Sequence, residues 1–161
     1  MKQKEVQFSY EIYSSIKHLE KVDAELLQKA RAITENAYAP YSNFQVGAVA
    51  KLADGSLVNG TNQENASFPA GLCAERVLVS AASSFHPGMA IETMAISYHN
   101  LNGESKHPIS PCGVCRQTLV EFERRQKKSI RLILGGLEGK VYVIPQASLL
   151  MPLSFTSDDL K

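Results

Sequence analysis

The sequence has neither a surplus of one charge nor a long apolar run. Its 17 Lys and Arg side chains nearly balance 16 Asp and Glu side chains, for a formal net charge of +1. This balance excludes a strong overall field that would attract nucleic acid or an anionic membrane. No stretch approaches the ~18 consecutive apolar residues that cross a bilayer, and the first residues, MKQKEVQFSY, lack the apolar run of a secretory signal. We therefore expect a cytoplasmic protein that recognises its partner through a local site.

Cysteine is scarce and its number is odd. The chain has 161 residues, of which 44% are hydrophobic, and three cysteines, Cys73, Cys112 and Cys115. A chain of this size can build the core of one domain without disulfide bonds. An odd number of cysteines also does not suit a complete disulfide framework. Another role must account for these three thiols.

The apolar patterns alternate between those of strands and those of helices. Val6, Phe8, Tyr10 and Ile12 alternate with polar residues, which predicts a half-buried strand near the amino terminus. Apolar residues at helical spacing from the N-cap candidate Asp23 predict a helix that ends before residue 40. Further patterns predict a β-hairpin over 46–58, helices over 73–84 and 112–125, strands over 91–98, 130–134 and 141–144, and a short helical tail after 148. Interleaved strands and helices indicate an α/β domain.

The cysteine spacing favours a metal site. Cys112 and Cys115 are three residues apart, so their thiols can converge on one ion if Cys112 begins a helix. Cys73 would add a third thiolate from another helix start, where exposed N–H groups lower the pKa of a thiol. Three thiolates suit zinc best, and three protein ligands leave one coordination position for water. A catalytic zinc is therefore the sharper hypothesis.

Other interpretations of these residues remain open. The Cys-x-x-Cys pair could be a redox motif, with Cys73 an ordinary buried thiol. A structural site could take its fourth ligand from a histidine, for which the candidates are His86, His99 and His107. Glu75 can project into the same cavity as Cys73, and Arg76 can offset the negative charge of the thiolates. The alternative for Glu75 and Arg76 is a solvated acid at a helix start beside a surface base.

Several longer motifs surround the cysteines, in a fixed order. They are Pro40-Tyr41-Ser42-Asn43-Phe44-Gln45-Val46-Gly47-Ala48, Asn62-Gln63-Glu64-Asn65-Ala66, Cys73-Ala74-Glu75-Arg76, Pro111-Cys112-Gly113-Val114-Cys115-Arg116-Gln117 and Leu150-Met151-Pro152-Leu153-Ser154-Phe155. In these motifs the chain resembles the small, homotetrameric, zinc-dependent cytidine deaminases, over roughly residues 24–156. The resemblance implies a three-layer α/β fold with a central mixed β-sheet flanked by helices. It also divides the chain into a catalytic domain, 24–161, and an amino-terminal extension, 1–23, expected to hold a β-strand.

The resemblance implies a reaction and a cofactor. The reaction is hydrolytic deamination of cytidine and 2′-deoxycytidine to uridine and 2′-deoxyuridine, which releases ammonia and serves pyrimidine salvage. One Zn²⁺ per subunit would be held by Cys73, Cys112 and Cys115. Glu75 would carry protons from water to the pyrimidine N3 and to the departing amine. Arg76 would lie next to the cysteine ligands without binding the metal itself.

The resemblance also assigns substrate contacts. Asn62 and Glu64 match residues that hydrogen-bond the sugar hydroxyls, and Phe44 matches an aromatic side chain that packs against the pyrimidine. The Ala74 backbone N–H and the Ser110 carbonyl match groups that orient the base and its amino group. We expect these residues to surround one cavity.

Neighbouring subunits complete the site in this family. The residues expected to reach a neighbour's nucleoside are Ala66, Phe68 and Phe155, which implies a homotetramer. Phe68 stands where many relatives carry Tyr and so lacks a hydroxyl that could form a hydrogen bond. The expected partners are cytidine, 2′-deoxycytidine and further copies of the chain, with no nucleic acid and no membrane.

Two other functions remain as alternatives. The first is a deaminase of cytosine in nucleic acid or of another cytosine-containing nucleoside. The only dense basic cluster, Arg124, Arg125, Lys127 and Lys128, is also favourable at a helix end without any phosphate partner. The second is a zinc-stabilised binding module without catalysis, which would leave Glu75, Asn62 and Glu64 without a purpose.

Overall fold

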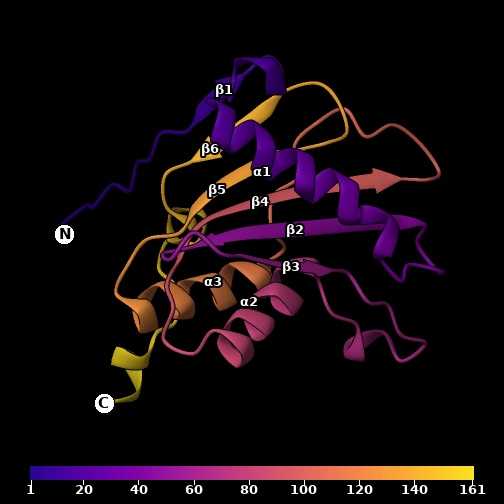
Figure 1. Cartoon of the computed structure of the whole chain (residues 1–161). Coiled ribbons are helices and arrows are strands. Elements are labelled where there is room, and N and C mark those ends of the chain that lie inside the picture. Colours follow the sequence, from indigo (N-terminus) through magenta and orange to yellow (C-terminus); the bar gives the residue numbers. More distant parts are fainter.

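A six-stranded mixed sheet runs through the molecule (Figure 1). The computed structural model describes all 161 residues. Along the sheet the order is β1-β6-β5-β4-β2-β3, in which β4 and β5 are parallel and the other neighbours are antiparallel. The strands are β1 (Glu11–Tyr13), β2 (Phe44–Leu52), β3 (Leu57–Thr61), β4 (Ile91–Asn100), β5 (Arg131–Gly135) and β6 (Val141–Ile144).

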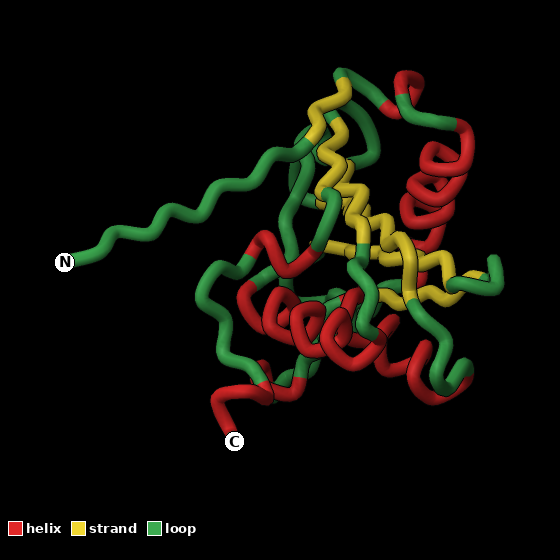
Figure 2. The backbone as a smooth tube through the Cα atoms, turned by 90° about the vertical axis from the view of Figure 1, so that its left-hand side faces the viewer, coloured by secondary structure: helices red, strands yellow, loops and turns green.

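Helices cover both faces of this sheet. Helix α1 (Lys21–Ala32) lies on one face, and α2 (Ala74–Phe85) and α3 (Gly113–Gln126) lie side by side on the other (Figures 1 and 2). Side chains alternate across β4, so Met94 and Ile96 join the core beneath α2 and α3 while Ala95 joins the core beneath α1. Because both faces are covered, the middle of β4 (94–96) and of β5 (132–134) is apolar on both sides of the sheet. The predicted three-layer α/β fold is confirmed.

Most of the predicted elements are present, with ends that differ by a few residues. The hairpin β2–β3 turns at Asp54 and Gly55, and Gly55 has a φ of +84°, a conformation that glycine adopts without strain. The short 3₁₀ helices are Ile16–His18, Ile33–Asn36, Phe68–Ala70, Ala147–Leu150 and Ser157–Leu160. Two of these form the carboxyl-terminal tail, for which short helical structure was predicted.

The start of α1 corrects one prediction. Glu20 is the N-cap residue, so Asp23 lies in the first turn and is not the cap. Its carboxylate instead pairs with Arg131 on β5, with Nη1–Oδ1 and Nη2–Oδ2 distances of 2.8 and 2.6 Å. This two-pronged ion pair ties α1 to the sheet. The helix also ends earlier than predicted, since a 3₁₀ turn replaces the α-helix after Ala32.

The amino-terminal strand is shorter than predicted. Only Glu11–Tyr13 pair with β6, and residues 1–10 extend away from the body (Figure 2). The four apolar side chains of the alternating pattern are exposed by 42–62%. The prediction of a half-buried strand from Val6 onward is therefore wrong for this chain by itself. The alternating pattern gives a strand one apolar and one polar face. A stable strand also needs a neighbouring strand to pair with and other residues to bury its apolar face.

Close approach of α2 to the sheet depends on Gly60 in β3. A Cβ atom at this position would lie 2.5 Å from the Ala74 carbonyl oxygen and 2.5 Å from the Leu78 backbone nitrogen. Both atoms belong to the backbone of α2, so neither can rotate out of the way. Glycine at position 60 therefore lets the first turn of α2 lie directly against β3.

Gly60→Ala should destabilise the fold by about 1–3 kcal/mol, because the added methyl group must push α2 from the sheet. Urea unfolding monitored by circular dichroism measures the change. Gly113→Ala is the matched control, since a Cβ at the start of α3 meets nothing within 4 Å. Equal stability of the two variants would contradict the argument.

Candidate active site and metal centre

Three thiols meet where α2 and α3 begin. Cys73 is the N-cap residue of α2, Cys112 is the N-cap residue of α3, and Cys115 lies in the first turn of α3. The Sγ atoms of Cys73 and Cys112 are 3.7 Å apart, and those of Cys112 and Cys115 are 3.5 Å apart. The predicted helix starts are thus present, and they bring the three cysteines together.

The trio fits the geometry of zinc. Zn–S bonds of about 2.3 Å place tetrahedral sulfur ligands ~3.8 Å apart, close to the observed spacings. All three Sγ atoms lie within 4.8 Å of one another, and no histidine or carboxylate joins the group. A zinc ion held here would have three protein ligands and one position free for water.

The predicted histidine alternatives lie away from this group. His86 is the C-cap residue of α2, at the opposite end of the helix from Cys73. His107 hydrogen-bonds the Tyr98 hydroxyl at 3.3 Å, and His99 lies on β4 opposite Gln45. A closed site of three cysteines and one histidine therefore does not form.

The electrostatic surroundings favour a thiolate at Cys73. Hydrogen bonds from Cys115 and Cys112 and the positive charge of Arg76 lower the pKa of Cys73 to about 6, against the opposing effect of burial. The hydrogen bond to Cys73 and burial raise the pKa of Cys115. Arg76 is half-buried on α2, and its Nη1 lies 3.5 Å from the Gly71 carbonyl oxygen. It is thus close enough to act on the thiols without lining the cavity.

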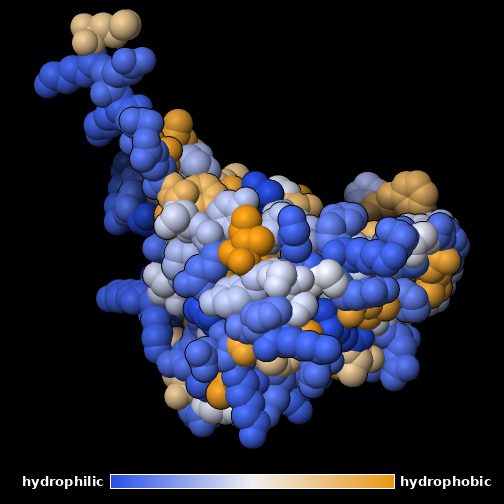
Figure 3. All heavy atoms as spheres, turned by 90° about the horizontal axis from the view of Figure 1, so that it is seen from above, coloured by the Kyte–Doolittle hydropathy of each residue, from blue (hydrophilic) through white to orange (hydrophobic).

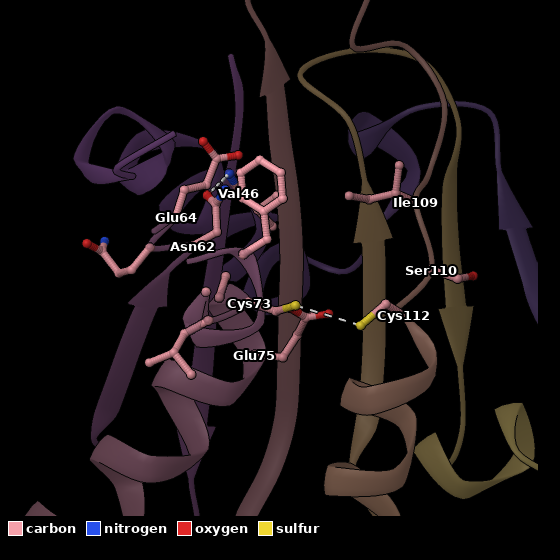
Figure 4. A pocket seen from close by; sticks show the side chains of 13 residues that line it. Val46, Asn62, Glu64, Cys73, Glu75, Ile109, Ser110 and Cys112 are labelled. Carbon is pink, nitrogen blue, oxygen red and sulfur yellow. Dashed lines mark hydrogen bonds between the residues drawn. The ribbon is translucent and has the colours of Figure 1, made fainter. Parts of the chain in front are cut away.

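Glu75 is a buried acid beside the thiols. Only 6% of its surface is exposed, and its carboxyl group points between Cys73 and Cys112 (Figure 4). Burial raises the pKa of Glu75, and the neighbouring Cys73 raises it further, whereas hydrogen bonding from its own backbone lowers it. A carboxyl group with a raised pKa keeps its proton to a higher pH than an exposed carboxyl group does, which suits a group that transfers protons.

A cavity of about 370 Å³ opens above these residues. It is large enough for a small organic ligand. Of the predicted site residues, those that line it are Asn62, Glu64, Phe68, Cys73, Ala74, Glu75, Ser110 and Cys112. Sequence reasoning missed five further lining residues, which are Val46, Gln63, Gly71, Leu72 and Ile109. Four of them lie next to a predicted site residue or inside a quoted motif, whereas Gly71 had no such signal.

Two polar side chains on one wall are held firmly. The Asn62 amide accepts from the Val46 backbone N–H at 2.7 Å and donates to the Phe44 carbonyl at 2.9 Å. Glu64 accepts from the Tyr41 backbone N–H at 2.8 Å and from the Ser42 hydroxyl at 2.5 Å. The hydrogen bond from Ser42 is the main cause that lowers the pKa of Glu64. Each side chain is thus fixed in place and keeps acceptor or donor capacity for a ligand.

Three of the predicted substrate-contact residues, Phe44, Ala66 and Phe155, do not line the cavity. Phe44 stacks on Tyr98, with ring centroids 4.8 Å apart and an angle of 12° between the ring planes. Ala66 and Phe155 are exposed, and the Phe155 backbone carbonyl accepts a hydrogen bond from Gln117 of α3 at 2.8 Å. Phe68 lines the cavity of its own chain yet is 75% exposed.

Comparison with known proteins agrees with this geometry. The sequence model described as "Cytidine and deoxycytidylate deaminase zinc-binding region" matches residues 20–130, which include the three cysteines and Glu75. A cytidine deaminase of Halalkalibacterium halodurans is 36% identical over 135 residues, which are 84% of this chain and 95% of that protein. The chain belongs to the cytidine deaminase family. It is accordingly an enzyme.

Further members of the cytidine deaminase family are similar over most of the chain. The cytidine deaminase of Sporosarcina psychrophila is 32% identical over 84% of this chain and 92% of that protein. The crystal structure of cytidine deaminase from Burkholderia pseudomallei has a TM-score of 0.70 and 38% identity, over 81% of this chain and 97% of that one. None of the helices in the present structure combines the length and the apolar character needed to cross a membrane.

Cys115→Ser should lose most of the bound zinc, because a serine hydroxyl is a far weaker zinc ligand than a thiolate. Elemental analysis of the purified variant measures the metal content. Val114→Ala is the matched control, since Val114 lies in the same helical turn and is 58% exposed. Full zinc content in Cys115→Ser would remove this thiol from the ligand set.

Proposed function

We propose that this enzyme deaminates cytidine and 2′-deoxycytidine hydrolytically, giving uridine, 2′-deoxyuridine and ammonia. The observation that carries the proposal is the buried carboxyl group of Glu75, which shares one cavity with the thiols of Cys73 and Cys112. A bound zinc, one per subunit in our proposal, would activate a water molecule at its free position. The relatives named as cytidine deaminases support this choice of base.

Glu75 is placed to move protons during the reaction. Its raised pKa suits a group that takes a proton from water and gives it to the pyrimidine N3. The same carboxyl group can then take the proton of the hydroxyl group added at C4 and pass it to the amine, which leaves as ammonia. Burial keeps bulk water from competing for the proton, so one side chain can serve both transfers.

The chain's own groups would orient the base. The Ala74 backbone N–H and the Ser110 carbonyl belong to cavity-lining residues on either side of the thiols. They can hydrogen-bond the carbonyl and amino groups of a cytosine ring. Phe44, held by its stack on Tyr98, would pack against the pyrimidine from the edge of the cavity.

The charge of the cavity favours a nucleoside over a nucleotide. Its lining contains two acids, Glu64 and Glu75, and no Lys, Arg or His. A 5′-phosphate would therefore meet carboxylates and no cation, which is unfavourable. Asn62 and Glu64 instead suit the hydroxyl groups of ribose or deoxyribose. This distinction also disfavours deamination within nucleic acid, whose backbone is anionic.

Assembly and location complete the proposal. Phe68 and Phe155, 75% and 59% exposed, would be covered in a homotetramer in which neighbours contribute these side chains and Ala66 to the site.

We place the enzyme in the cytoplasm, because its three cysteines are free thiols and that compartment keeps thiols reduced. There it would serve pyrimidine salvage. We assign this chemistry to residues 24–161, with 1–23 as an extension.

Glu75→Gln tests the catalytic assignment. The amide cannot relay a proton, so turnover of cytidine should fall by ~10²-fold or more. Zinc content and melting temperature should stay near those of the native enzyme. Glu121→Gln is the control, because Glu121 is an exposed acid on α3. Turnover within a few-fold of the native enzyme would show that another group relays the proton.

A substrate series tests the nucleoside assignment. Ammonia release from cytidine and 2′-deoxycytidine should far exceed release from cytidine 5′-monophosphate, cytosine and a cytosine-containing oligonucleotide. Glu64→Ala should cut kcat/KM for cytidine by about tenfold or more, since a hydrogen bond to a charged group is lost. Its activity on free cytosine, which has no sugar, should not change. A parallel loss on both substrates would place Glu64 elsewhere in the mechanism.

A further inference from the structure

The N-terminal arm, residues 1–10, contains none of the residues assigned to the catalytic site. It precedes the region matched by the family, which begins at residue 20. The arm stands clear of the body (Figures 2 and 3). Val6, Phe8 and Tyr10 are exposed by 62%, 42% and 44%. Apolar side chains gathered on a projecting segment are typical of a surface that another protein segment buries.

The edge strand that follows the arm has an unpaired side. β1 is the last strand of the sheet, so only one of its edges is hydrogen-bonded. Ile12 lies opposite Tyr142 of β6, and the Tyr10 ring packs on the Tyr142 ring at 5.1 Å between centroids. The Phe8 ring follows at 6.3 Å from the Tyr10 ring. One apolar row therefore runs from the sheet out along the arm, beside a free strand edge.

We propose that the arms of two copies of this chain pair with each other as antiparallel strands, about a two-fold axis at Ser9. In this register Val6 of each copy faces Ile12 of the other, and Phe8 faces Tyr10. Every apolar member of the row thus meets an apolar residue on the same face. The polar face pairs Gln7 with Glu11 and Ser9 with Ser9. The partner is a second copy because the segment is complementary to itself.

Neighbouring registers are less favourable. An axis at Gln7 would place Lys4 opposite Tyr10, and an axis at Phe8 would place Glu5 opposite Glu11, which repel each other. An axis between two residues would set apolar side chains opposite polar ones, since successive side chains point to opposite faces. An axis at Tyr10 would place Val6 opposite Ser14. Of these centres, only Ser9 pairs every apolar member of the row with an apolar residue.

This pairing uses features that β1 already has. The free edge of β1 supplies unpaired backbone N–H and C=O groups, which strand addition satisfies. The sheets of two copies would then join through their β1 strands, and the row from Val6 to Ile12 would be covered. Pairing would also extend the regular strand from Glu11 back to Val6, the length that the alternating sequence predicts.

Cysteine cross-linking tests the arrangement on the full-length, zinc-loaded enzyme. Antiparallel partners have Cα atoms about 4.5–5.5 Å apart, a distance that a disulfide spans. Under mild oxidation, Ser9→Cys should therefore form a covalent dimer on non-reducing gels, several-fold more than the unmodified chain or Gln3→Cys. An equal yield from Ser9→Cys and Gln3→Cys, or no Ser9→Cys dimer, would overturn the proposal.

Two further experiments separate specific pairing of the arms from chance collision. Gln7→Cys and Glu11→Cys should cross-link with each other when mixed, and far less when oxidised alone. In the Ser9→Cys background, Phe8→Ser should reduce the dimer several-fold because Phe8 faces Tyr10 across the pair. Lys2→Ser, outside the paired segment, is the control. If Phe8→Ser and Lys2→Ser give the same yield, the apolar row does not bring the arms together.

Discussion

The convergence of two helix starts on one cavity is the constraint on which the site depends. Cys73 and Cys112 both precede the first helical residue, so each thiol lies where unpaired N–H groups favour negative charge. Gly60 allows α2 to lie against β3, and the first turn of α3 adds Cys115. The same first turn of α2 carries Glu75 into the cavity. One packing arrangement therefore supplies both the metal ligands and the proton carrier.

The two polar side chains on one wall of the cavity, Asn62 and Glu64, hold local structure together and are also placed to bind a ligand. Asn62 follows the last residue of β3, and its side chain continues the hydrogen bonding between β2 and β3. Glu64 is fixed by the loop that leads into β2, through Tyr41 and Ser42. Neither side chain has to be ordered when a ligand arrives, which lowers the entropic cost of binding. The proposed sugar contacts are thus prepared by bonds that the hairpin already makes.

Sequence patterns predicted most strands and helices because central strands and amphipathic helices have strong periodicities, whereas the three-layer arrangement came from the family resemblance. They also predicted the cysteine trio, since its spacing restricts how the thiols can meet. They could not show that Asp23 pairs with Arg131, because that contact joins residues 108 positions apart. Nor could they show that Val46 and Ile109 line the cavity, since an apolar residue in or near a strand is ordinarily core. The assignment of Asn62, Glu64 and Phe44 came from the family resemblance.

The parallel pairing of β4 with β5 has a consequence for how the chain matures. The crossover that joins these strands contains α3, so Cys112 and Cys115 meet Cys73 when α2 and α3 lie together on one face of the sheet. A nascent chain has two neighbouring thiols and a distant third, and such a pair binds zinc less tightly than the assembled trio. Contacts between distant segments form slowly, so capture of the metal would come late in folding. A site built from these three thiols would thus report the correct packing of α2 and α3, because it is complete only when both helices are in place.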